Sequence, residues 1–84
     1  MLKHAVIDTN ALVAVVDSRD NWHAKAQDLL NALKTEKVSE VYFDCVLNET
    51  INVLARRSEE RKRSEEFPQI LDELFKQVPV EMIT

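Results

Sequence analysis

Residues 5–16, which read AVIDTNALVAVV, carry the strongest indication of the fold. Three apolar residues come first, then the polar triplet Asp8-Thr9-Asn10, and then six more apolar residues. An unbroken apolar run is typical of a strand that is buried on both faces, as in a parallel sheet. Aspartate, threonine and asparagine favour turns and the N-caps of helices. We therefore expect a buried strand at residues 5–7, a sharp turn, and a short helix over residues 10–16.

Apolar residues at helical spacing predict three further helices. The first covers residues 22–33 and has one apolar stripe, which consists of Trp22, Ala26, Leu29, Leu30 and Leu33. The second follows a buried strand expected at residues 41–43, and Asp44 is expected to cap it. The third begins between Ser64 and Pro68, because proline is accepted in a helix only in the first turn. A third strand is expected at residues 79–83.

These elements follow one another in the order β-α-α-β-α-α-β, which is typical of an α/β fold. We therefore predict a three-layer α/β/α architecture with a short parallel sheet and right-handed crossovers. The 84 residues of the chain correspond to a single domain, residues 1–84.

The composition excludes several classes of function. The sequence contains no glycine, so a glycine-rich phosphate loop cannot form. The net charge of −4 argues against a strongly basic nucleic-acid-binding surface, although a bound divalent cation reverses the charge of an acidic site. The single cysteine cannot form an internal disulfide, and no apolar stretch is long enough for a membrane span. We expect a soluble, cytoplasmic protein with no membrane association.

Asp8 and Glu49 are the two acidic residues whose positions suggest chemistry. Asp8 follows the first strand at its carboxyl end, where ligands bind in open α/β sheets, but an aspartate there also serves as a helix N-cap. Glu49 lies in the first turns of the helix after the second strand, where it is either solvated or faces the same rim of the sheet. If the two carboxylates converge, they share a proton or bind a divalent cation.

The segments around these acids resemble the motifs of one nuclease family. Residues 6–12, Val6-Ile7-Asp8-Thr9-Asn10-Ala11-Leu12, are similar to the opening motif of PIN-domain nucleases. Residues 41–49 and 53–57 are similar to the second signature of that family, and residues 22–26 resemble the start of its second helix. Within the family, the pattern is most similar to the VapC-like toxin ribonucleases of prokaryotic toxin–antitoxin pairs.

The resemblance implies a metal-dependent endoribonuclease. PIN domains place three or four acidic residues around one or two Mg²⁺ or Mn²⁺ ions and hydrolyse phosphodiester bonds, generally in RNA. Asp8 and Glu49 match the first two of these acids, which act as catalytic residues and metal ligands, and Thr9 or Asn10 would orient Asp8 or its water. The likeness to toxins also implies an antitoxin protein as a partner.

The remaining acids of the family have no match in this sequence. They follow the third strand in PIN domains, whereas Glu81, the acid in the expected last strand, occupies no motif position. We therefore expect the chain to correspond to the N-terminal part of a PIN domain that holds Mg²⁺ less well than a complete one. The alternative is a non-catalytic interaction or oligomerisation module. Such a module would form a homo-oligomer through apolar surface that has no partner within the chain. A phosphoacceptor role for Asp8 fits less well, because no acidic pair precedes the end of the first strand.

Structural roles are expected for the other polar residues. The loop acids are interpreted as solvated, namely Asp17, Asp20 and Glu40. His4 and His23 are isolated from other ligand-type residues, and Cys45 is expected to be a small buried hydrophobe. The basic residues, namely Arg56, Arg57, Arg61, Lys62 and Arg63, either follow an RNA backbone or form a solvated helix face with i,i+4 ion pairs. The apolar stripe of residues 22–33 is expected to lie in the core, and any part left exposed would promote self-association.

Overall fold

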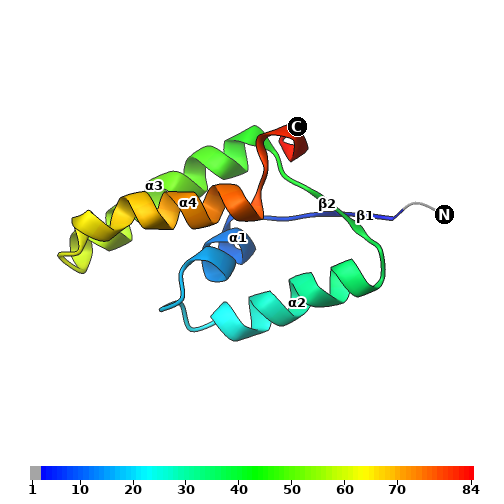
Figure 1. Ribbon diagram of the computed structural model, residues 1–84, viewed down its shortest axis with the longest axis horizontal. Coiled ribbons are helices and arrows are strands. Elements are labelled where there is room, and N and C mark those ends of the chain that lie inside the picture. The colour runs from blue at the N-terminus through cyan, green and yellow to red at the C-terminus, as the bar shows by residue number, and fades with distance from the viewer. Residues whose placement is uncertain (1–2) are drawn as a thin grey trace.

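The computed structural model describes residues 3–84, which form two parallel strands and four α-helices (Figure 1). The elements in chain order are β1 (His4–Val6), α1 (Thr9–Val16), α2 (His23–Thr35), β2 (Ser39–Val41), α3 (Asp44–Glu60) and α4 (Phe67–Gln77). Short 3₁₀ turns lie at Ser64–Glu66 and at Val80–Met82. The molecule is elongated, and the strands lie at one end while the turn between α3 and α4 lies at the other. No helix within residues 3–84 combines the length and the apolar character that crossing a membrane requires.

The two strands pair in parallel and confirm the predicted α/β class. The prediction of a strand at residues 5–7 that is buried on both faces is wrong, because β1 covers His4–Val6 and Val6 is 60% exposed. His4 lies opposite Ser39 and Val6 lies opposite Val41. The Ile7 N–H continues the ladder by donating to the Val41 carbonyl at 3.0 Å. The carboxyl ends of both strands therefore lie side by side, which places the segments that follow them at the same edge.

The third strand predicted at residues 79–83 is wrong. The backbone N–H groups of Met82 and Ile83 donate to carbonyls three residues earlier, so they form a 3₁₀ turn instead of a ladder. A single parallel bridge between Tyr42 and Ile83 remains, with the Thr84 N–H donating to the Tyr42 carbonyl at 2.8 Å. The C-terminal residues thus reach the outer side of β2 without forming a strand.

The second strand and the helix cap after it are displaced from their predicted positions. β2 ends at Val41, and Phe43 rather than Asp44 is the N-cap of α3, with no side-chain hydrogen bond. The backbone of Tyr42 bonds to the C-terminal residues instead of to β1, which ends the two-stranded ladder. Asp44 becomes the first residue of α3, where its negative charge still favours the helix dipole.

Helix α1 forms the centre of the hydrophobic core. Its residues 12–15 are all buried, and it packs against α2, α3 and α4. The unbroken apolar run after the Asp8-Thr9-Asn10 triplet is explained by this position, since a helix surrounded by other helices has no solvent-facing side. The helix begins at Thr9, one residue before the predicted start, because Asp8 caps it.

Two helices are each followed, two residues after their last residue, by a lysine that has a left-handed backbone. Lys37 and Lys62 have φ values of 58° and 57°. After α2, the Lys37 N–H donates to the Lys34 carbonyl and the Val38 N–H to the Leu33 carbonyl. The same pair of bonds follows α3, from Lys62 to Glu59 and from Arg63 to Ser58. Both ends are Schellman motifs, in which the left-handed position is usually glycine.

Glycine at either of these positions is expected to stabilise the protein. The left-handed conformation costs a lysine about 1 kcal/mol or more, whereas glycine adopts it freely. We expect Lys37→Gly and Lys62→Gly each to raise the free energy of unfolding by about 0.5–1 kcal/mol after the added entropy of the unfolded chain is included. Urea unfolding followed by circular dichroism measures the change.

The matched control is Lys34→Gly, which places glycine inside the last turn of α2. It is expected to lower the free energy of unfolding by about 0.5–1 kcal/mol, since glycine is a poor helix former. If Lys37→Gly destabilises the protein as much as Lys34→Gly does, the left-handed helix ends are not a source of strain.

Candidate functional site

Asp8 occupies the turn between β1 and α1 and is exposed to solvent. Its Oδ1 accepts a hydrogen bond of 2.9 Å from the Ala11 N–H, so the predicted capping interpretation is confirmed. Within residues 3–84, no hydrogen bond reaches its second oxygen, Oδ2. The cap therefore fixes the orientation of the carboxylate and still leaves one oxygen for a ligand.

Glu49 lies in the second turn of α3 and is likewise exposed. Its Oε2 accepts a hydrogen bond of 3.2 Å from the Thr9 hydroxyl, and Thr9 is the next residue after Asp8. This contact follows from the parallel pairing, because α1 and α3 begin at the same edge of the sheet and pack against each other. The predicted second acid thus lies against the first turn of α1, the turn that Asp8 caps.

The donor set suits a hydrated divalent cation. Mg²⁺ retains several waters and is commonly held by one or two carboxylates. Asp8 and Glu49 are both exposed, so waters have room to complete the coordination. Within residues 3–84, no group of three or more histidine, cysteine, aspartate or glutamate side chains is close enough to hold a metal ion. Thr9, expected to orient Asp8, instead donates its hydroxyl to Glu49.

A groove of about 720 Å³ extends from Glu49 along the molecule. Its base is α1, including Thr9 and Asn10. One wall is α3 from Glu49 to Arg57, and the other is the start of α2 together with the loop before it. Asp8 does not line this groove, whereas the next residue, Thr9, does.

A second hollow, of about 750 Å³, lies between the C-terminal end of α1 and α4. Its lining is mainly polar and includes Asp17, Glu66 and Gln77. Neither Asp8 nor Glu49 contributes to it, so it is separate from the candidate site.

Two of the predicted loop acids belong to a buried ion-pair network. Asp17 is only 5% exposed, and its carboxylate accepts hydrogen bonds from Arg57 at 2.8 Å and from Arg61 at 3.0 Å. Asp20 is bound by the same Arg57 at 2.8 Å. The prediction that these acids are solvated is therefore wrong, because α3 brings two arginines, one turn apart, against the loop after α1.

The basic run of residues 56–63 divides between two roles. Arg56 and Arg63 form exposed pairs with Glu60 and Glu66, as expected for a solvated helix face. Arg57 and Arg61 instead bind the acids of the α1–α2 loop. Local spacing could not reveal this pairing, since the partners lie about 40 residues apart in the chain.

The pKa values of Asp17 and Asp20 are lowered by this network. Burial raises the pKa of Asp17, but hydrogen bonds from Arg61, Arg57 and the Arg19 N–H outweigh it. The Arg57 hydrogen bond and then the Trp22 N–H lower the pKa of Asp20.

Acid is therefore expected to destabilise the protein through these two groups. The unfolded chain has carboxyl pKa values of about 3.9 and takes up protons at a higher pH than the folded state does. The stabilisation is present above that value and is lost as the pH falls through the folded pKa values. We expect the free energy of unfolding to fall as the pH drops below about 5, and to fall less steeply in Asp17→Asn. Urea unfolding at several pH values tests this, and an equal decline in both proteins would contradict it.

Several other predicted roles change in the structure. Cys45 is exposed rather than buried, because it lies about 200° around α3 from the buried Leu47. Glu40 lies in β2 rather than in a loop and accepts a hydrogen bond from the Tyr42 hydroxyl at 3.0 Å. Burial raises the pKa of Tyr42 to about 12.

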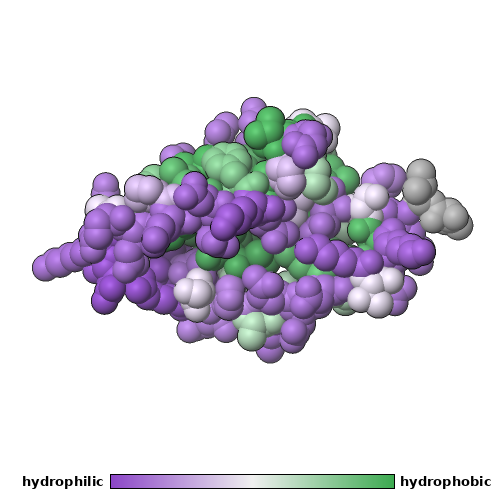
Figure 2. Space-filling view, in the orientation of Figure 1, coloured by the Kyte–Doolittle hydropathy of each residue, from purple (hydrophilic) through white to green (hydrophobic). Residues whose placement is uncertain are grey.

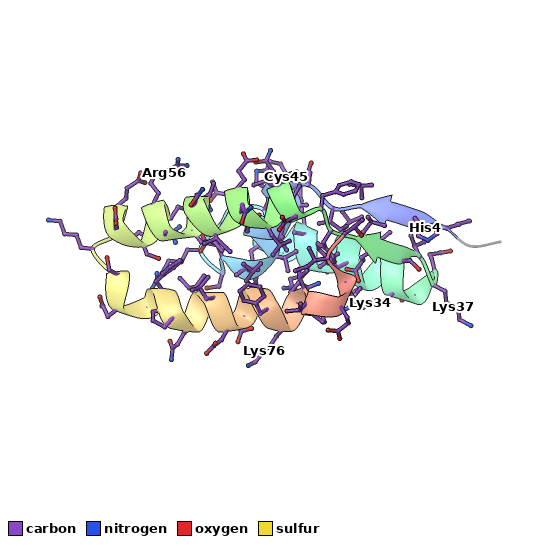
Figure 3. The ribbon with its side chains drawn as sticks, turned by 90° about the horizontal axis from the view of Figure 1, so that it is seen from above. His4, Lys34, Lys37, Cys45, Arg56 and Lys76 are labelled. Atoms are coloured by element: carbon purple, nitrogen blue, oxygen red, sulfur yellow. The ribbon has the colours of Figure 1, made fainter. Side chains whose placement is uncertain are left out.

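The two histidines lie in different elements of the fold. The Nδ1 of His23 is 2.7 Å from the Ala14 carbonyl, which joins α2 to α1. His4 lies in β1 and is exposed, at the end of the molecule away from α3 and α4 (Figure 3). Neither belongs to a cluster of metal-ligating side chains within residues 3–84.

The apolar stripe of α2 is only partly buried. Ala26 and Leu30 lie in the core as predicted, whereas Trp22 is 61% and Leu29 is 52% exposed. The reason is geometric, since α1 covers only one side of α2 and leaves the side that borders the groove open. The sequence pattern indicated the amphipathic face correctly but overestimated how much of it is covered.

Comparison with known protein families identifies the family to which this fold belongs. The family description "PIN domain" matches residues 5–83, which is nearly the whole chain. The search of curated proteins and the search of solved structures give no match. PIN domains are typically metal-dependent nucleases, and the matched range includes both Asp8 and Glu49. The chain belongs to the PIN domain family.

Proposed function

We propose that this protein is a metal-dependent endoribonuclease in which Asp8 and Glu49 bind Mg²⁺ or Mn²⁺. The observation that carries the proposal is the hydrogen bond between Thr9 and Glu49, which draws the second acid to the turn that Asp8 caps. The membership in the PIN domain family supports a nuclease in general. The likeness of residues 6–12 and 41–49 to toxin ribonucleases supports RNA as the substrate and an antitoxin protein as a partner.

The roles of the individual residues follow from their contacts. The Ala11 N–H orients the Asp8 carboxylate through Oδ1, which leaves Oδ2 for a cation. Thr9 orients the Glu49 carboxylate in the same way through Oε2. A bound divalent cation would neutralise charge on the scissile phosphate and make a water molecule a better nucleophile at neutral pH. In the hydrolysis, the water oxygen bonds to phosphorus, the bond to the leaving ribose oxygen breaks, and that oxygen gains a proton.

The direct test is cleavage of a fluorescently labelled single-stranded RNA by the purified chain. We expect cleavage with Mg²⁺ or Mn²⁺ and its loss in EDTA, restored when the metal is added back in excess. Asp72→Asn removes an exposed acid of α4 and is expected to leave cleavage unchanged. Cleavage that continues in EDTA, or no cleavage with either metal, would contradict the proposed function.

A second candidate function is a non-catalytic module that associates with another copy of itself. It is favoured by exposed apolar side chains near the C-terminal end of the described chain, where Val80 is 72%, Phe75 is 40% and Met82 is 37% exposed. Figure 2 shows apolar atoms gathered on this part of the surface, whereas the end where α3 and α4 meet is hydrophilic. Exposed patches of this kind often mark interaction sites.

Light scattering together with the cleavage assay separates the two candidates. A homo-oligomer that shows no EDTA-sensitive cleavage would support the interaction module. A homo-oligomer that cleaves RNA only with metal would support the nuclease and would also agree with self-association. Phe75→Glu is expected to shift such an oligomer towards monomer, because it places a charge in the apolar surface.

A further inference from the structure

The wall of the groove formed by α2 carries an exposed tryptophan. Trp22 is the only tryptophan in the chain, is 61% exposed, and lines the same groove as Glu49. It precedes the first residue of α2 and makes no side-chain capping bond. An aromatic ring open to a groove is suited to stacking on a flat ligand.

Two exposed cations line the same groove, Lys25 and Arg56. The Nζ of Lys25 lies over one face of the Trp22 ring, 4.7 Å from its centre, and Lys25 has no acidic partner within residues 3–84. Arg56 has a side chain that is 66% exposed, with Glu60 at 3.8 Å. Arg57 differs, because Asp17 and Asp20 already engage it.

The three side chains line the same groove as Glu49 of the candidate metal site. Glu49 and Arg56 lie two turns apart on α3 and both line the groove, about 10 Å apart along the helix axis. Trp22 and Lys25 lie on the opposite wall, and the small side chains of α1 form the base between them. A ligand that is held at Glu49 therefore extends between Trp22, Lys25 and Arg56.

We propose that this groove binds a nucleotide of single-stranded RNA next to the phosphate that is cleaved, with its base stacked on Trp22 and its phosphate held by Lys25 and Arg56. The combination of an exposed aromatic ring with the cations of Lys25 and Arg56 fits a ligand that is both aromatic and anionic. The inference rests on the proposed nuclease function, and it makes Trp22, Lys25 and Arg56 substrate-positioning residues.

The fluorescence of Trp22 reports on binding directly, since no other tryptophan contributes. The probe is an eight-nucleotide 2′-O-methyl RNA, which resists cleavage, titrated in EDTA so that the metal site plays no part. We expect saturable quenching of Trp22 emission and an affinity that decreases as salt is added. Asp72→Asn, which changes an exposed acid of α4 outside this groove, is expected to show the same quenching as the unchanged protein.

Substitutions assign the contacts, with affinity measured from the anisotropy of the labelled probe. Trp22→Ala is expected to weaken binding about tenfold, and Trp22→Phe is expected to restore most of it. Lys25→Gln and Arg56→Gln should each reduce the slope of log affinity against log salt by about 0.7. Lys76→Gln is the matched control, since Figure 3 shows Lys76 on the outer side of α4 and Arg56 on the outer side of α3.

The outcomes separate this inference from the proposed function. Normal quenching without metal-dependent cleavage would overturn the nuclease and leave the binding groove supported. Metal-dependent cleavage with affinity unchanged in Trp22→Ala would overturn the groove alone. An absence of quenching would also overturn the binding groove. Emission that changes with protein concentration but not with added RNA would overturn it as well, because a second copy of the chain then covers Trp22.

Discussion

Replacement of Asp8 by asparagine is expected to reduce metal-dependent RNA cleavage by a factor of about 100 or more, without unfolding the protein. Asparagine caps helices as well as aspartate does, so the bond from the Ala11 N–H is retained. What is lost is the negative charge that holds the cation, and a catalytic cation contributes several kcal/mol to the transition state. The measurement is the single-turnover rate at saturating Mg²⁺ or Mn²⁺, with circular dichroism to verify the fold.

Glu49→Gln makes the same test at the second acid, which lies on α3. Glutamine still accepts a hydrogen bond from the Thr9 hydroxyl, so the contact between α1 and α3 is kept while the charge is removed. We expect a loss of similar size, partly recovered at higher metal concentration. Full activity in either variant would show that its carboxylate does not bind the cation.

Replacement of Asp17 by alanine is expected to have the largest effect on stability. It leaves Arg57 and Arg61 without their shared partner beneath the α1–α2 loop. Removal of one member of a buried ion pair typically costs 3–5 kcal/mol. Because the two arginine side chains remain 32% and 29% exposed, we expect a smaller loss of about 2–3 kcal/mol. For a chain of this length that corresponds to a decrease in melting temperature of roughly 10–20 °C.

The exposed pair between Arg56 and Glu60 supplies the control for this experiment. It lies on the same helix, but both side chains are 66% exposed, so Glu60→Ala is expected to cost less than about 0.5 kcal/mol. Asp20→Ala should fall between the two, since Asp20 has only Arg57 as an ion-pair partner. If Asp17→Ala is as mild as Glu60→Ala, the network does not hold the loop in place.

The sequence predicted the parts of the fold that depend on local patterns. Apolar periodicity and the polar triplet at residues 8–10 located the four helices and the turn that carries Asp8. The mostly apolar segment 79–83 is typical of a strand, but Pro79 begins a turn whose N–H groups bond locally. Apolar character alone does not distinguish a short exposed turn from an edge strand.

The parts of the site that sequence reasoning missed depend on contacts between distant segments. Asp17 and Arg57 lie 40 residues apart, and neither position has a local feature that predicts the other. The exposure of Trp22 was missed for a related reason, because a helical stripe shows which face is apolar but not which part of it a neighbour covers. The hydrogen bond of Glu49 to Thr9 agrees with the expectation that strand ends and helix starts share one edge.

Paramagnetic broadening by Mn²⁺ in an amide NMR spectrum tests most directly whether residues 8 and 49 share one cation. We predict that substoichiometric Mn²⁺ broadens the amide signals around both residues together, and that either Asp8→Asn or Glu49→Gln abolishes the effect at both places. Broadening confined to one of the two segments, or broadening that persists at one after the other carboxylate is removed, would contradict a shared site.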